Sequence, residues 1–189
     1  MGNPQHKLTL TEFLAWEDTQ SERHEFVGGE VFAMVGARRV HGRIVMNLGR
    51  LIGNALHGTP CEVYAETMKV QVDASVFYPD LFVTCDPRDL RTEQVFVAPT
   101  VIVEVLSPST QAYDRSLKFA HYRRIDSLRE YVLVDPETLR VEVFRLGTEG
   151  WVLHDMSDRA VLTLASVGCE LAMAAVFEGV ERPGADSAS

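Results

Sequence analysis

The 189-residue chain has no apolar run long enough to cross a bilayer, and its first residues lack the uninterrupted apolar stretch of a secretory signal. The sequence therefore predicts a cytoplasmic protein. Internal repeats and linkers are also missing, and 46% hydrophobic with 24% charged residues is typical of one globular domain. We expect that domain to span residues 1–180, followed by a disordered tail over 181–189 that is too small and polar to build a core.

Cysteine is scarce, because the chain has three, Cys61, Cys85 and Cys169, spaced far apart. This odd number and this spacing suit neither a disulfide framework nor a C-x-x-C metal site. The sequence therefore predicts three reduced cysteines in the core.

An excess of positive charge is missing as well, since the formal net charge is −9. This argues against a protein that coats nucleic acid by bulk electrostatics. It leaves a local basic face open, because arginines gather in two segments of the chain. Candidate substrate-binding residues from these segments are Arg39, Arg43 and Arg115. For any single arginine, a solvated helix face is the simpler interpretation.

The order of hydrophobic patterns predicts a mixed α/β fold. Thr9 and Glu12 form a capping-box signature for a short helix, and Gly28-Gly29 is typical of a hairpin turn. Helical spacing begins at Arg39 and lasts to about His57. Strands are then expected within 61–73, 77–85 and 100–106, a helix over 112–125, and a strand over 129–135 that runs parallel to the strand before that helix. Two further strands, over 139–146 and 150–156, would extend the C-terminal side. The result is an αβββαβ core with a central mixed sheet flanked by helices, plus an N-terminal helix and hairpin and a C-terminal β extension.

Two carboxylates stand in stretches that are built to be buried. Asp80 follows Pro79 and precedes Leu-Phe-Val, and Glu104 interrupts the apolar strand Val-Ile-Val-Glu-Val-Leu. A buried charge costs several kcal/mol unless it is paired or holds a metal. If the two strands are neighbours, the carboxylates form an oxygen site suited to Mg²⁺ or Mn²⁺. The alternatives are a turn or cap role for Asp80 and a buried ion pair with an arginine for Glu104.

The helix that follows the Glu104 strand carries Asp114, Lys118 and Tyr122 at intervals of four residues, so the three share one face. Lys118 could reach over the strand end, orient an attacking water and offset negative charge in the transition state. The alternative is a surface pair of Asp114 with Lys118, worth a few tenths of a kcal/mol.

These residues resemble the P-D…(D/E)-x-K nuclease superfamily, whose core has the same order of elements. More narrowly, the motifs "HEFVGGEV", "VHGRIVMNL", "YPDLFV", "VIVEVLSPST" and "EYVLVDP" resemble the Uma-type family of restriction endonucleases, between about Glu25 and Arg145. The resemblance implies that Asp80, Glu104 and the backbone carbonyl of Val105 bind Mg²⁺ or Mn²⁺. It also implies hydrolysis of phosphodiester bonds in DNA by a metal-activated water. Leu106 occupies the usual position of the superfamily lysine, and Lys118 on the following helix would replace it.

Further candidates carry open alternatives. Glu25 could assist the metal or be an exposed hairpin charge. His41 could contact phosphate or make a local hydrogen bond at its helix start. Tyr122 and Tyr131 are most simply packing residues.

Two other functions compete with the nuclease. Leu106 and the acidic net charge favour an inactive nuclease-fold module that binds nucleic acid or protein, whereas the joint presence of Asp80, Glu104 and Lys118 favours the enzyme. A buried ion-pair triad kept for stability is the weakest hypothesis, since apolar packing often replaces such pairs without loss. Cleavage of both strands of a DNA duplex would require a homodimer, which the sequence leaves open. The apolar stretch at 169–177 could be a core strand or an interface, and we expect it in the core.

Overall fold

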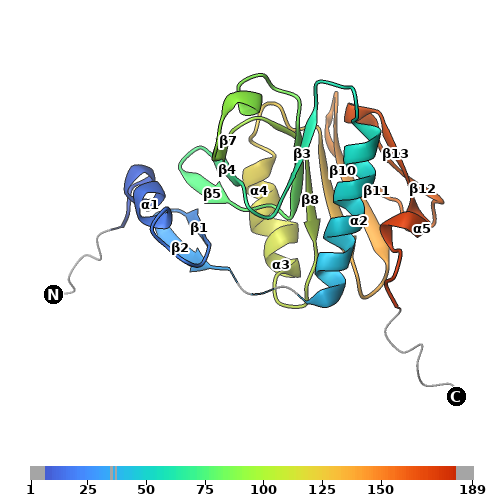
Figure 1. Cartoon of the computed structure of the whole chain (residues 1–189), viewed down its shortest axis with the longest axis horizontal. Coiled ribbons are helices and arrows are strands. Elements are labelled where there is room, and N and C mark those ends of the chain that lie inside the picture. Colours follow the sequence, from blue (N-terminus) through green and yellow to red (C-terminus); the bar gives the residue numbers. More distant parts are fainter. Residues whose placement is uncertain (1–6, 35, 37, 182–189) are drawn as a thin grey trace, which may run out of the picture.

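The computed structural model describes residues 7–34, 36 and 38–181. Its largest sheet has six strands in the order β11-β10-β9-β8-β6-β3 (Figure 1). Neighbouring strands are antiparallel except β8 and β9, which are parallel as predicted. The strands are β3 (Glu62–Ala65), β6 (Leu81–Thr84), β8 (Pro99–Val105), β9 (Glu130–Asp135), β10 (Arg140–Gly147) and β11 (Gly150–Asp155).

A second sheet corrects the expectation of three uninterrupted core strands. The first expected strand breaks after β3 at Glu66, whose φ of 49° turns the chain, and the second breaks at Pro79. The second half of the first expected strand, the segment up to Phe77 and a short strand from the loop before β8 join the N-terminal hairpin in a five-stranded sheet of order β2-β1-β5-β4-β7. Its strands are β1 (His24–Val27), β2 (Glu30–Ala33), β4 (Lys69–Val72), β5 (Ser75–Phe77) and β7 (Val95–Phe96).

Helices pack on both faces of the six-stranded sheet (Figure 1). Helix α2 (Arg39–Ala55) buries one face with residues such as Ile44 and Leu48, close to the predicted bounds. The second predicted helix covers the other face as α3 (Gln111–Tyr113), a π-helical segment η2 (Asp114–Lys118) and α4 (Phe119–Tyr122). It ends three residues before the predicted Ile125, and η2 is a widened turn of the kind that recurs at functional sites.

The N-terminal unit forms as the sequence predicts. Helix α1 (Leu10–Glu17) begins with the capping box of Thr9 and Glu12. Gly28 and Gly29 adopt φ of 61° and 87°, which a two-residue hairpin turn requires and other residues rarely adopt. The ring of Phe13 stacks on Phe26 with centroids 4.7 Å apart, so helix and hairpin share a small core.

The two strands expected over 139–146 and 150–156 are β10 and β11 of the large sheet. The segment after them packs back on α2 and contains β12 (Val161–Leu164), η3 (Ala165–Val167), β13 (Cys169–Ala172) and α5 (Met173–Val176). Another short helix, η1 (Asp89–Arg91), lies earlier in the chain. The stretch expected in the core is buried through Cys169, Leu171, Met173 and Val176. The predicted tail lies outside the described residues beyond Glu181. Among the described helices, none is both long and apolar enough to span a membrane.

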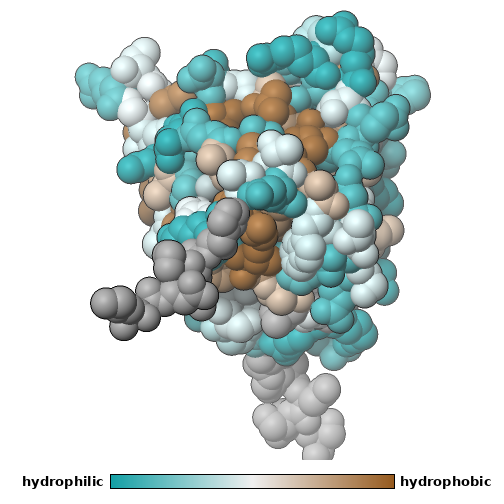
Figure 2. Space-filling model, turned by 90° about the vertical axis from the view of Figure 1, so that its left-hand side faces the viewer, coloured by the Kyte–Doolittle hydropathy of each residue, from teal (hydrophilic) through white to brown (hydrophobic). Residues whose placement is uncertain are grey.

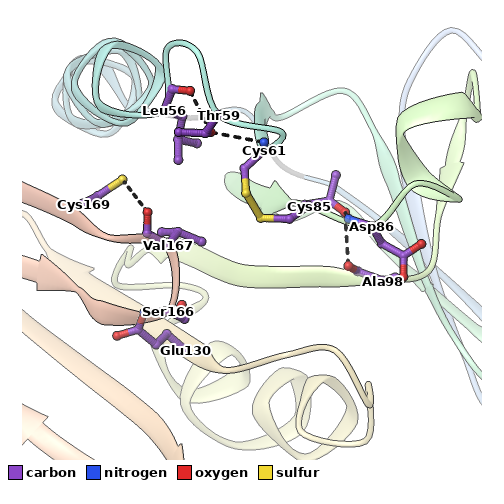
Figure 3. Close-up of a disulfide and its surroundings, with 11 residues drawn as sticks. Leu56, Thr59, Cys61, Cys85, Asp86, Ala98, Glu130, Ser166, Val167 and Cys169 are labelled. Carbon is purple, nitrogen blue, oxygen red and sulfur yellow. Dashed lines mark hydrogen bonds between the residues drawn. A yellow bond between two sulfur atoms is a disulfide. The ribbon is translucent and has the colours of Figure 1, made fainter.

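The prediction of three reduced cysteines is wrong for two of them. Cys61 and Cys85 form a disulfide between the adjacent ends of β3 and β6, with Cα atoms 4.1 Å apart (Figure 3). The pairing of Glu62 with Thr84 explains this, since the two cysteines lie one position further along the same ladder. Cys169 is free and buried, as predicted. Because disulfides are rare in cytosolic proteins, this bond weighs against the cytoplasmic expectation.

Candidate active site

Asp80 lies directly before β6, where the ladder pairs Leu81 with Val103 of β8. Its Oδ2 atom accepts a hydrogen bond from the Val105 backbone N–H at 2.6 Å and lies 3.1 Å from Nε2 of His41. The side chain is 16% exposed. His41 belongs to the first turn of α2, and its contact with Asp80 joins residues 39 positions apart. It is therefore not the local hydrogen bond at the helix start that was the alternative. These contacts hold the Asp80 carboxylate against the end of β8.

Glu104 is buried on the face of β8 that packs against η2 and α4. Its Oε1 atom accepts hydrogen bonds from Lys118 Nζ at 3.0 Å and from the Tyr122 hydroxyl at 3.1 Å. Both donors come from one continuous helical segment, η2 followed by α4, and their spacing of i and i+4 places them on the same face. The sequence interpretation of Tyr122 as a packing residue is right for its ring and missed its hydroxyl. A buried tyrosine where phenylalanine would pack equally well is the signal that points to such a bond.

Lys118 is the centre of the cluster. Besides Glu104, its Nζ atom lies 3.1 Å from Glu25 and 3.4 Å from Asp114, and its side chain is 8% exposed. Two of the alternative interpretations are therefore wrong. Glu25 of β1 is buried and is not an exposed hairpin charge, and the pair of Asp114 with Lys118 is buried and is not a surface pair. The Tyr131 hydroxyl donates to the Asp114 carbonyl at 2.9 Å, which anchors the π-helical turn to β9.

The cluster perturbs its own carboxylates. Burial raises the pKa of the Glu104 carboxyl well above its ordinary value, and repulsion from Asp80 and Asp114 adds to the effect against the attraction of Lys118. Burial likewise raises the pKa of Asp114. In both carboxyls burial is the main cause, and it favours the neutral, protonated form.

In the two basic groups, burial and the neighbouring charges act on the pKa in opposite directions. Burial alone would lower the pKa of Lys118, but the carboxylates around it, Glu104 first, raise that pKa well above its ordinary value. Burial would also lower the pKa of His41, and the hydrogen bond and charge of Asp80 outweigh it, so the pKa is raised. Lys118 is therefore a permanent cation at physiological pH.

These groups line a cleft of about 930 Å³ between the N-terminal hairpin, the start of α2 and the loop after β8. In it, one ligand atom each of His41, Glu66 and Asp80 lies within 4.8 Å of the others, a spacing that a metal ion could bridge. Sequence reasoning missed Glu66, whose place beside Asp80 follows from the hydrogen bond of its N–H to the Asp80 carbonyl at 3.0 Å. No local pattern in the sequence indicates that contact.

The arginines predicted to bind substrate lie elsewhere. Arg115 pairs with Glu142 of β10, Arg43 lies beside Gly179, and neither these nor Arg39 belong to the cleft lining as the described residues define it. Arg23 and Arg38 line the cleft instead. Arg38 pairs with Glu137, and Arg23 donates to the Glu66 carbonyl at 3.0 Å.

The fold and the buried carboxylates at the end of β8 define a protein of the restriction-endonuclease-like class. A solved structure from Anabaena variabilis, described as "a putative nuclease", has the same fold, with a TM-score of 0.75 and 21% identity over 90% of this chain and 97% of that one. The chain belongs to the Uma2 family, described as "Putative restriction endonuclease", whose model matches residues 10–174. This confirms the family and fold that the sequence motifs indicate.

Two curated relatives come from Synechocystis and are both described as uncharacterized proteins. One is 37% identical over 94% of this chain and 95% of its own length. The other is 34% identical over 79% of this chain and 87% of its own length. Family and fold together support a nuclease of the restriction-endonuclease type.

Proposed function

We propose that the protein is an endonuclease that hydrolyses phosphodiester bonds in DNA with the help of a divalent cation. The observation that carries the proposal is the charge of the cluster. Among the described residues it holds the carboxylates of Glu25, Glu66, Asp80, Glu104 and Asp114 beside Lys118 and His41, and Glu25, Glu104 and Asp114 are buried. Negative charge in excess in a partly buried cluster requires protons or a bound cation to balance it.

Asp80 is the natural ligand for that cation, because it is common to two candidate sets of ligands. The set that the family resemblance implies adds Glu104 and the Val105 carbonyl, and an all-oxygen set fits Mg²⁺ or Mn²⁺. The other set adds His41 and Glu66, one ligand atom of each lying within 4.8 Å of the others, and an imidazole favours Mn²⁺ or another transition metal over Mg²⁺. We assign the ion to the Glu104 side. When bound, such an ion would polarise the phosphate and lower the pKa of a water molecule.

The chain's own residues supply orientation and charge. Lys118 is permanently protonated, so it acts as a hydrogen-bond donor and a positive charge next to the developing phosphorane-like charge, and not as a general base. Glu25 and Asp114 hold the Lys118 ammonium in place, and Tyr122 fixes the rotamer of Glu104. His41 orients Asp80 in the same way.

The decisive experiment is calorimetric titration of Mn²⁺ into the parent and an Asp80→Ala variant, together with cleavage of DNA at matched protein concentrations. We expect binding and cleavage in the parent and neither in the variant. Glu104→Gln should abolish cleavage with the fold intact. Glu66→Gln should leave both nearly unchanged, and loss of binding there would move the ion to the His41 side. Cleavage by Asp80→Ala, or by the parent in excess chelator, would overturn the proposal.

One observation favours a second candidate, an inactive module that binds nucleic acid or protein. Lys118 and Tyr122 already occupy Oε1 of Glu104, and Leu106 fills the position where the superfamily has its lysine. Nucleic-acid binding without Mn²⁺ binding or cleavage would establish this alternative. If the substrate is double-stranded, each site cuts one strand, and we expect two copies to act together.

A further inference from the structure

The hairpin beside the cleft has two unlike faces. Its register places Phe26 opposite Val31 and Glu25 opposite Phe32. Phe26 and Val31 pack with Phe13 of α1 in the small N-terminal core. Because side chains alternate along a strand, Glu25 and Phe32 share the other face, and the contact of Glu25 with Lys118 shows that this face looks into the site.

Phe32 is 45% exposed, although it is a large aromatic residue on the wall of a polar cleft. Met34 and Val40 line the cleft with it and add apolar surface to this part of the lining. Figure 2 views the side of the molecule that carries α1 and the hairpin, and it shows apolar surface within a largely polar face. The packing of the hairpin accounts for Phe26 and Val31 and leaves the ring of Phe32 without such a role.

The positive charge in the cleft is too small to bind the many phosphates of a DNA duplex. Of the basic side chains that line it, Lys118 and Arg38 are paired with carboxylates, and His41 lies against Asp80. Arg23 keeps its charge while it donates to a backbone carbonyl, so the described lining offers one arginine without a carboxylate partner. Duplex binding rests on many phosphate contacts, each from a lysine or arginine. A single strand can instead be held by stacking of its bases on aromatic side chains, worth about 1–3 kcal/mol for each base.

We propose that Phe32 is a stacking platform for a nucleobase next to the scissile phosphate, and that the preferred substrate is single-stranded or locally unpaired DNA. The inference rests on the proposed nuclease function and names its substrate. A base inside a duplex has both faces covered by its neighbours, so it can meet the Phe32 ring only when it is unstacked. Phe32 then acts as a specificity-determining residue, since it contacts a base and not the reacting phosphate.

The test uses one oligonucleotide sequence as a single strand and as a duplex, with Mn²⁺ and four proteins: the parent, Phe32→Ala, Phe32→Trp and Leu153→Ala. Leu153 is a matched control, because it is 50% exposed on β11, away from the cleft. We expect the parent to cut the single strand faster than the duplex. Phe32→Ala should raise KM for the single strand about 10- to 100-fold with a smaller change in kcat. Phe32→Trp and Leu153→Ala should behave like the parent.

A binding readout separates failure of this inference from failure of the nuclease. The same strand, labelled with 2-aminopurine, should lose fluorescence when its base stacks on Phe32 or on the tryptophan, and not with Phe32→Ala. Quenching without cleavage by any of the proteins would overturn the nuclease and support the platform. Cleavage with an unchanged KM in Phe32→Ala, or a preference for the duplex, would overturn the platform and leave the nuclease standing.

Discussion

At the scale of single residues, the site depends most on Lys118, because its ammonium faces three buried carboxylates. Lys118→Met keeps the length of the side chain and leaves those carboxylates unpaired. Removal of one partner from a buried ion cluster costs about 3–5 kcal/mol, so we expect the free energy of unfolding to fall by that amount. Equilibrium unfolding in denaturant measures it.

The control for this prediction is Lys7→Met. Lys7 pairs with Glu30 at 3.7 Å on the surface, where both side chains are more than 60% exposed. An exposed pair contributes about 0–1 kcal/mol, so this variant should be close to the parent. Equal effects of the two substitutions would show that Lys118 is not structurally paired in solution.

His41 gives the metal-free protein a pH dependence whose sign follows from its raised pKa. The stability that the His41 contact with Asp80 contributes is complete below the ordinary histidine value of about 6.5 and is lost as pH rises through the raised pKa. In excess chelator, His41→Gln should therefore be more destabilising at about pH 5.5 than at about pH 9. In an Asp80→Asn background this difference between the two pH values should shrink, because burial and the weaker effects of Glu66 and Asp114 remain, and a difference of unchanged size would assign the effect to another group.

At the scale of elements, the disulfide joins two strands that carry the site. Cys61 precedes β3 and Cys85 follows β6, and 24 residues separate them in sequence. Replacement of both by alanine removes the covalent link to β3, an edge strand. It should lower the free energy of unfolding by about 2–4 kcal/mol, mainly because the unfolded chain gains conformational entropy without the crosslink. A reducing agent should have the same effect on the parent and none on the double variant. Insensitivity of the parent to reductant would contradict this.

Local sequence patterns predicted most of these elements. The capping box of α1, the Gly28-Gly29 hairpin, the bounds of α2 and the parallel pairing of β8 with β9 all depend on neighbouring residues or on a short crossover, and all are confirmed. The break of the first expected strand was not predicted, because Glu66 carries no glycine-like signal for its left-handed conformation. Pro79 did carry a signal, since proline cannot donate a ladder hydrogen bond and belongs at the start, edge or bulge of a strand, and β6 begins two residues after it.

At the scale of the whole molecule, the two sheets and their helices bring distant segments to one cleft. Glu25 arrives from the hairpin, His41 from α2, Asp80 and Glu104 from adjacent strands, and Lys118 from the π-helical turn. The formal net charge of −9 has the same sign as this acidic centre. One domain over residues 1–180 stays a prediction, and the matched family region of 10–174 covers most of it.

The sequence by itself determined the family, the order of the core elements and the identity of Asp80, Glu104 and Lys118 as a group, because a charge inside an apolar strand stands out without any structure. Tertiary structure decided which groups meet that trio. Glu66, Cys61 and Cys85 look ordinary in sequence, and the sequence left open which partners Glu25 and Tyr122 would find. Their contacts join residues 14 to 93 positions apart, and only the packed sheets and helices define those pairs. Local patterns record whether a residue suits burial, whereas the partner it finds there is set by how the whole chain packs.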